Sequence, residues 1–72
     1  MKRWKPKSGD TYWYVNHLFE VEGATWIEDG IDEFLYKCHN CFKTIKQAKK
    51  LAVLMRKTAR ETSKELHRGY LI

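Results

Sequence analysis

The chain has 72 residues, a formal net charge of +5 and 43% hydrophobic residues, among them three Trp, four Tyr and three Phe. This length predicts a single domain over residues 1–72, and the aromatic content supplies a core and argues against disorder. No apolar run approaches the roughly 18 residues of a membrane span, and no apolar segment follows the basic N-terminus, so we expect a cytoplasmic protein without a membrane partner.

The N-terminal segment, residues 4–10, is predicted to be an extended arm followed by a turn. Pro6 fixes its own backbone angle and biases Lys5 toward extended structure, and Gly9 permits the turn. Trp4 is expected to fold back onto the core, since its large apolar area would otherwise stay in water. The alternative is a frayed basic terminus.

Three strands are predicted over residues 11–16, 18–27 and 32–38. The first contains only strand-forming residues, and alternation places Trp13 on one face and its two neighbouring tyrosines on the other. Gly23, inside the second strand, indicates a bulge or a tight bend. Asp29-Gly30 has the chemistry of a hairpin turn, which would separate the second and third strands.

One long helix is predicted over residues 45–67. A capping box, Thr44 followed by Gln47, marks its start, and Gly69 marks its end. At about 100° per residue, the apolar face that should cover the sheet comprises Ile45, Ala48, Leu51, Ala52, Met55, Ala59, Thr62 and Leu66. The predicted fold class is therefore α+β, with a three-stranded antiparallel sheet packed against one long C-terminal helix (βββα).

The helix face next to this apolar stripe is almost entirely basic. Residues 34–60 carry eight Lys and Arg and no Asp or Glu, whereas residues 10–33 carry seven Asp and Glu and no Lys or Arg. Such a stripe is either a solvated face or a surface that binds nucleic acid or an acidic partner, and we favour binding. Val53 falls inside the stripe, either as an isolated surface residue or as the apolar centre of a contact patch. The candidate partner-binding residues are Lys46, Lys49, Lys50, Val53, Arg56, Lys57, Arg60 and Lys64.

Cys38 and Cys41 form a Cys-x-x-Cys pair, which raises the question of a metal or redox site. A structural zinc site needs four ligands, and the three histidines do not lie at the spacing of a zinc finger. The pair also lacks the βαβ surroundings of a thioredoxin-like site. We predict two thiols that pack as small hydrophobic residues, one at a strand end and one at the start of the helix, with no metal and no cofactor.

Four carboxylates, those of Glu28, Asp29, Asp32 and Glu33, cluster around one predicted turn. A catalytic pair needs a pocket that separates the two pKa values, and so small a domain has little room for one. We interpret the cluster as a solvated acidic turn. Because the sequence also lacks a phosphate loop and a nucleophile elbow, we predict that the protein is not an enzyme.

The order strand-strand-strand-helix, with Phe42-Lys43-Thr44 leading to Ala48, resembles the N-terminal arm-binding domains of tyrosine-type phage integrases. In that family a three-stranded sheet enters the major groove of DNA, so the resemblance implies a DNA-binding sheet. The family's sheets are basic, whereas residues 10–33 of this chain are acidic.

A larger part of the chain is similar to a group of small phage and prophage proteins. The shared pattern consists of Trp4, Pro6 and Gly9, then Tyr12-Trp13-Tyr14-Val15, Trp26 and Asn40-Cys41-Phe42-Lys43-Thr44. This resemblance spans most of the sequence and implies a phage origin. Many small phage proteins block host machinery, CRISPR effectors included, and this expectation rests on analogy of fold and origin.

These observations predict a non-enzymatic phage-type interaction protein that binds and blocks a host defence or nucleic-acid-processing complex, as anti-CRISPR inhibitors do. Its partner would be a host protein or ribonucleoprotein complex in the host cytoplasm. The alternative is a small DNA- or RNA-binding protein that uses the basic helix face. Both a monomer and a homodimer are compatible with the size, since so small a core gains from burying more surface.

Overall fold

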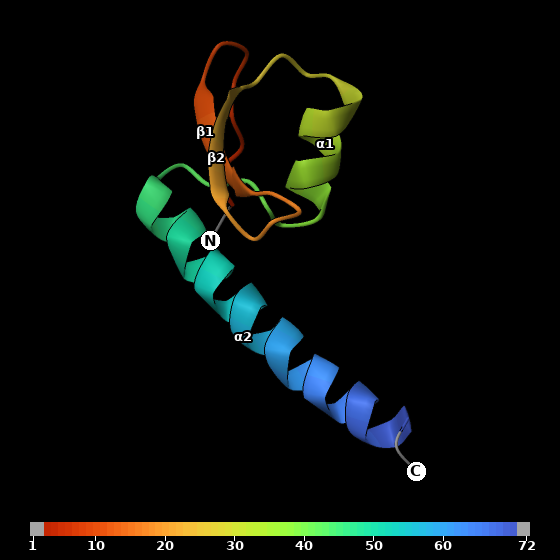
Figure 1. The fold of residues 1–72 in the computed structure, drawn as a ribbon. Coiled ribbons are helices and arrows are strands. Elements are labelled where there is room, and N and C mark those ends of the chain that lie inside the picture. The colour runs from red at the N-terminus through yellow and green to blue at the C-terminus, as the bar shows by residue number, and fades with distance from the viewer. Residues whose placement is uncertain (1–2, 71–72) are drawn as a thin grey trace.

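The structure, a computed structural model, describes the backbone of residues 3–70 and the side chains of residues 3–66. Its elements are β1 (Thr11–Val15), β2 (Val21–Thr25), α1 (Gly30–Lys37) and α2 (Ile45–Tyr70). The chain is an α+β protein, but the predicted βββα arrangement is wrong. In the described part of the chain, a two-stranded antiparallel sheet is followed by two helices, one beside the hairpin and one running away from it (Figure 1).

The turn of the β1–β2 hairpin is built on Asn16. Its side-chain Oδ1 accepts hydrogen bonds from the backbone N–H groups of Leu18 at 2.8 Å and Glu20 at 3.0 Å. An Asn side chain that accepts from the N–H two residues further on is a common turn device. Residues 16–20 therefore form a loop, and the second strand is shorter than the predicted 18–27.

Gly23 lies in the middle of β2, directly opposite Trp13, in an unbroken register. The predicted bulge or bend at this glycine is therefore wrong. The glycine is required instead because the Trp13 ring lies over it, and a Cβ at this position would lie 2.7 Å from Trp13 Cζ3. A glycine inside a strand often marks such a close approach.

Replacing Gly23 with Ala is expected to displace the Trp13 ring and to lower the free energy of unfolding by about 1–3 kcal/mol, the usual cost of overpacking. Urea unfolding measures the loss, and near-UV circular dichroism reports the displaced ring. Gly30→Ala is the matched control, because nothing lies within 4 Å of a Cβ at that position. Equal stability of the Gly23→Ala variant and the wild type would contradict this account.

The predicted third strand is instead the helix α1. Asp29 caps its N-terminus, because its side-chain Oδ1 accepts a hydrogen bond from the backbone N–H of Asp32 at 2.8 Å. Acidic Asp32 and Glu33 lie in the first turn and basic Lys37 in the last, which is the charge order that the helix dipole favours. The Asp29-Gly30 pair therefore begins a helix, where the sequence had indicated a hairpin turn.

The carboxylate of Asp32 is buried, with 4% of the residue exposed, and it joins α1 to the hairpin. Its Oδ1 accepts a hydrogen bond from the Tyr12 hydroxyl at 2.6 Å, and its Oδ2 accepts one from the Ile27 backbone N–H at 2.7 Å. Burial acts to raise the pKa of this carboxyl, but the hydrogen bonds from Tyr12 and the backbone outweigh burial and hold the pKa below its usual value. The interpretation of Asp32 as part of a solvated acidic turn is therefore wrong.

A carboxyl whose pKa is depressed in the folded state stabilises the fold above its unfolded pKa of about 3.9, and this stabilisation is lost as the pH falls through the folded pKa. We expect Asp32→Asn to lower the free energy of unfolding at pH 7 by about 2 kcal/mol, because hydrogen bonds to a charged group are lost. The difference in the free energy of unfolding between wild type and variant should become smaller as the pH falls below about 4. Urea unfolding from pH 7 to pH 2 measures this difference.

Tyr12→Phe is the companion variant, because it keeps the carboxylate and the hydrogen bond from the Ile27 N–H. The Tyr12→Phe substitution should lower the free energy of unfolding at pH 7 by less than Asp32→Asn does. A gap between wild type and Asp32→Asn that stays constant from pH 7 to pH 2 would contradict the depressed pKa.

The main core lies between the hairpin and α1. Tyr12 and Trp26 are 1% and 0% exposed, and their rings meet edge to face with centroids 5.8 Å apart. Trp26 makes a second edge contact, at 6.3 Å, with the ring of Tyr36 in α1. Trp4 packs against this cluster, which confirms that the N-terminal arm folds back onto the core. Aromatic edge contacts therefore hold the arm, the hairpin and α1 together.

The segment between the two helices pairs with the edge of β1 that β2 leaves free. The Asn40 side chain accepts a hydrogen bond from the backbone N–H of Val15 at 2.8 Å and donates one to the Val15 carbonyl at 2.7 Å. It therefore makes the two hydrogen bonds that the backbone of a neighbouring strand would make with Val15. Two residues later, Phe42 exchanges two backbone hydrogen bonds of 2.8 Å with Trp13. These contacts fix where α2 begins relative to the sheet.

The predicted capping box at the start of α2 is confirmed. The Gln47 backbone N–H donates to Thr44 Oγ1 at 3.2 Å, and the Thr44 backbone N–H donates to Gln47 Oε1 at 3.3 Å. The helix then continues through Gly69 to Tyr70, so the predicted end at residue 67, with Gly69 as terminator, is wrong.

The first half of α2 packs on the hairpin, where Ala48 and Ala52 are 0% and 3% exposed. The predicted apolar face is confirmed for Ala48 and Ala52 and for Leu51, Met55 and Ala59, which are half-buried. It is wrong for Ile45 at the start of the helix and for Thr62 and Leu66 in its second half, which are exposed. The described structure measures 51 × 25 × 24 Å, because the second half of α2 projects from the folded head (Figure 1).

Candidate polyanion-binding helix

Positions at intervals of three and four residues along α2 lie in one row on one side of the helix. This row consists of Lys46, Lys50, Val53, Lys57, Arg60 and Lys64, so every position in it except Val53 is cationic. At a rise of about 1.5 Å per residue the row is about 27 Å long.

The cations of this row are solvent-exposed. The first carboxylate along α2 is that of Glu61, so the first four turns have no acidic residue to offset the lysines. Among the side chains of residues 3–66 there is one ion pair, between Lys5 Nζ and Glu33 Oε1 at 3.7 Å. The cations of α2 therefore form no ion pair within these residues. A row of exposed cations without carboxylate partners produces a positive potential that attracts polyanions.

Four of the predicted site residues surround one shallow depression on the first half of α2. We call this surface the basic patch, and it consists of Lys46, Lys49, Lys50, Val53 and Leu54. Val53 and Leu54 are 60% and 59% exposed and form its apolar centre. The lysines form a cationic rim, and their aliphatic stems extend the apolar surface. The depression that Val53 and Leu54 share supports the interpretation of Val53 as the apolar centre of a contact patch, which stays a prediction.

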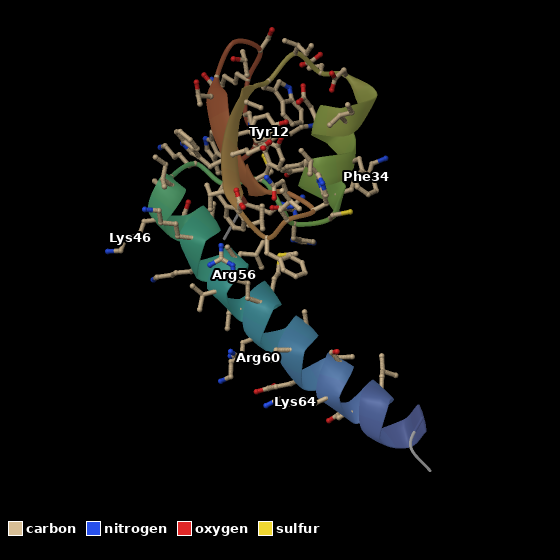
Figure 2. The ribbon with its side chains drawn as sticks, viewed as in Figure 1. Tyr12, Phe34, Lys46, Arg56, Arg60 and Lys64 are labelled. Atoms are coloured by element: carbon tan, nitrogen blue, oxygen red, sulfur yellow. The ribbon has the colours of Figure 1, made fainter. Side chains whose placement is uncertain are left out.

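Three further predicted cations, Lys57, Arg60 and Lys64, lie from the middle of α2 onward. The second half of the helix projects beyond the hairpin and α1, and Arg60 and Lys64 extend from it into solvent (Figure 2). A partner can therefore approach Arg60 and Lys64 without meeting the folded head.

Arg56 has a structural role that the sequence did not indicate. Its Nη2 donates a hydrogen bond of 2.7 Å to the backbone carbonyl of Phe19, in the turn between β1 and β2. Phe19 has a φ of 61°, an uncommon conformation for a non-glycine residue. The guanidinium therefore joins the turn to α2, and Arg56 stands apart from the other predicted site residues.

Arg56→Ala is expected to lower the free energy of unfolding by about 1 kcal/mol, a modest value because the hydrogen bond is exposed to solvent. Hydrogen exchange should increase at the turn amides as well. Lys57→Ala is the matched control, since Lys57 is exposed and should change stability by less than about 0.5 kcal/mol. Equal stabilities of the two variants would show that the Arg56 contact does not hold the turn.

The two cysteines are both free, but they lie in different surroundings. Cys41 is buried in the core, which confirms its prediction as a small hydrophobic residue, whereas Cys38 is exposed at the end of α1, so its predicted burial at a strand end is wrong. Burial raises the pKa of the Cys41 thiol to about 11, with a further contribution from Asp32. A thiol with so high a pKa is a poor nucleophile and metal ligand at neutral pH. Within the described residues, no group of three or more His, Cys, Asp or Glu side chains could hold a metal ion.

α2 has 26 residues, enough to exceed the roughly 20 that a bilayer requires. Its many cations make it far too polar, however, and no helix in residues 3–70 combines the length and the apolar character of a membrane span.

Comparison with protein-family models, with curated proteins and with solved structures found no significant match to this chain.

Proposed function

We propose that the protein is a non-enzymatic binding protein whose basic α2 face contacts a host complex that processes nucleic acid. The observation that carries this proposal is the row of exposed cations on a helix that projects from the folded head. Proteins and ribonucleoproteins that handle nucleic acid present either phosphates or acidic surfaces, and both complement such a row.

The basic patch supports a protein or ribonucleoprotein partner. Its exposed apolar centre, Val53 and Leu54, is surrounded by three lysines, and an apolar centre with a polar rim is the usual anatomy of a protein interface. The resemblance to small phage proteins makes a host defence complex, CRISPR effectors among them, the partner class to test first. In this proposal the protein blocks that complex by occupying a surface that normally receives nucleic acid.

Direct binding of DNA or RNA is the second candidate. It is favoured by Lys57, Arg60 and Lys64, which are exposed and continue the row beyond the basic patch. Contacts of this kind bind phosphates with little regard to sequence. The integrase-like alternative, in which a three-stranded sheet enters the major groove, is excluded for the described residues because their sheet has two strands.

The non-enzymatic character is part of this proposal. Asp32, the buried carboxylate with a lowered pKa, accepts hydrogen bonds from Tyr12 and Ile27 and so serves the fold. The use of Asp32 in the fold supports the proposal that this carboxylate is not one of a catalytic acid–base pair.

Fluorescence anisotropy with labelled DNA and RNA tests the second candidate. We expect Lys57→Glu/Lys64→Glu to weaken binding at least tenfold and to reduce the slope of log K against log salt by about 2, because two phosphate contacts are lost. Lys7→Glu/Lys37→Glu is the control, with the same change of charge at two exposed positions outside α2. A flat titration of the wild type at low salt, or equal losses in the two variants, would exclude direct binding through α2.

Affinity capture from nuclease-treated host extract tests the first candidate. The wild type should retain a protein complex that Lys49→Glu/Lys50→Glu loses, and the wild type should restore plaque formation by a phage that a host defence system restricts. Nuclease treatment separates the two candidates, since capture through nucleic acid alone would disappear. Absence of both a captured complex and a plaque effect would overturn the proposed inhibition.

A further inference from the structure

A group of exposed apolar side chains lies at the start of α1. Ile27, Ile31 and Phe34 are 65%, 69% and 64% exposed. Ile31 and Phe34 are three residues apart and share one side of the helix. The backbone of Ile27 is joined to the first turn of α1, because its N–H donates to Asp32 Oδ2 at 2.7 Å. Large apolar side chains this exposed on one short segment indicate a contact surface.

Carboxylates accompany these apolar side chains. Residues 27–34 contain four Asp and Glu and no Lys or Arg. Asp32 is buried and Glu33 pairs with Lys5, which leaves Glu28 and Asp29 exposed at the surface. We call this surface the acidic patch, and it consists of Ile27, Glu28, Asp29, Ile31 and Phe34.

The acidic patch and the basic patch are complementary at the ends that would meet. Each has two or three exposed apolar side chains; Glu28 and Asp29 flank Ile27 and Ile31 on the acidic patch, whereas lysines surround Val53 and Leu54 on the basic patch. The cation nearest the acidic patch on α1 is Lys37, one turn beyond Phe34 at the far end of the helix. Complementary potentials around apolar centres favour association and fix its orientation.

The two patches lie on different sides of the molecule. Phe34 in the acidic patch and Lys46 in the basic patch point away from each other, from opposite sides of the folded head (Figure 2). One chain therefore cannot bring its own patches together, but two chains can. We propose that the acidic patch of one copy docks on the basic patch of a second copy, with Ile31 and Phe34 against Val53 and Leu54.

This contact joins two different surfaces, so it is heterologous, and each added copy leaves one acidic and one basic patch free for the next. The product is a chain or a ring of copies, in contrast to a twofold dimer. Both patches are small, so the contact should be weak, and exposed charges make it sensitive to salt. The inference does not depend on the proposed function.

Sedimentation equilibrium tests the contact directly. We expect the average mass of the wild type to rise above the 8.7 kDa of one chain as the concentration increases at low salt, and to return toward 8.7 kDa at about 1 M salt, where exposed charges are screened. Lys49→Glu/Lys50→Glu and Glu28→Lys/Ile31→Lys should each remain at the mass of one chain. Lys57→Glu/Lys64→Glu, with the same charge change outside the basic patch, should associate as the wild type does.

Mixing the two monomeric variants gives the decisive result. The first retains a native acidic patch and the second a native basic patch, so the average mass of an equimolar mixture should rise from the 8.7 kDa of one chain to at least the roughly 17 kDa of a pair. No other pairing of surfaces predicts both the loss in each variant and the recovery in the mixture.

Three outcomes would overturn the inference: a wild type that stays monomeric at millimolar concentration in low salt, an association that survives either double substitution, and a mixture that gives no pair. In the third case the acidic patch serves a foreign partner.

Failure of the proposed self-association is distinguishable from failure of the proposed function. Glu28→Lys/Ile31→Lys leaves the α2 cations intact and should bind polyanions as the wild type does, whereas Lys57→Glu/Lys64→Glu should lose that binding and keep self-association.

Discussion

The hydrogen bonds of the Asp32 carboxylate hold the folded head together. A two-stranded hairpin is marginal by itself in water, so β1 and β2 require a second layer. α1 provides that layer, and Asp32 joins it to the hairpin through the Tyr12 hydroxyl and to the preceding loop through the Ile27 N–H. The charge on Asp32 is tolerated inside the protein because these donors replace the water that it loses. The aromatic contacts of Trp26 with Tyr12 and Tyr36 then form around this junction.

This arrangement separates the two kinds of charge in the chain. Three carboxylates of the first half serve the structure of the head: Asp32 is buried, Asp29 caps α1 at the surface and Glu33 pairs with Lys5 at the surface. The cations of the second half lie on α2, and only its first turns are needed to cover the hairpin. A helix needs tertiary packing for most of its stability, and the well-packed start of α2 supports a projecting end that can carry charge without structural cost to the core.

The elements that could be predicted from the sequence are those that local interactions determine. β1 and the capping box of Thr44 and Gln47 depend on residues within one turn or one strand, and both were predicted correctly. α1 was missed because Asp29-Gly30 suits a hairpin turn as well as a helix start, and because the aromatic residues that follow suit both periods. Asp32 bonds Tyr12, which is 20 residues away, and Arg56 bonds Phe19, which is 37 residues away. No local pattern reveals pairs this far apart in the chain. From the sequence, Asp32 was therefore predicted to be solvated and Arg56 to belong to the binding surface.

The basic patch is common to both proposed interactions, and this has a thermodynamic consequence. Lys46, Lys49 and Lys50 cannot contact a polyanion and the acidic patch of a second copy at the same time, so each ligand must weaken the binding of the other. Nucleic acid or an acidic partner would therefore shift self-associated chains toward single copies, by an amount set by its own affinity and concentration. The cations at Lys57, Arg60 and Lys64 lie outside the contested surface and remain available in both states. Under the two proposals these cations would be a first attachment point from which a polyanion displaces the neighbouring copy, and the projecting end of α2 would then serve the exchange between the two partners.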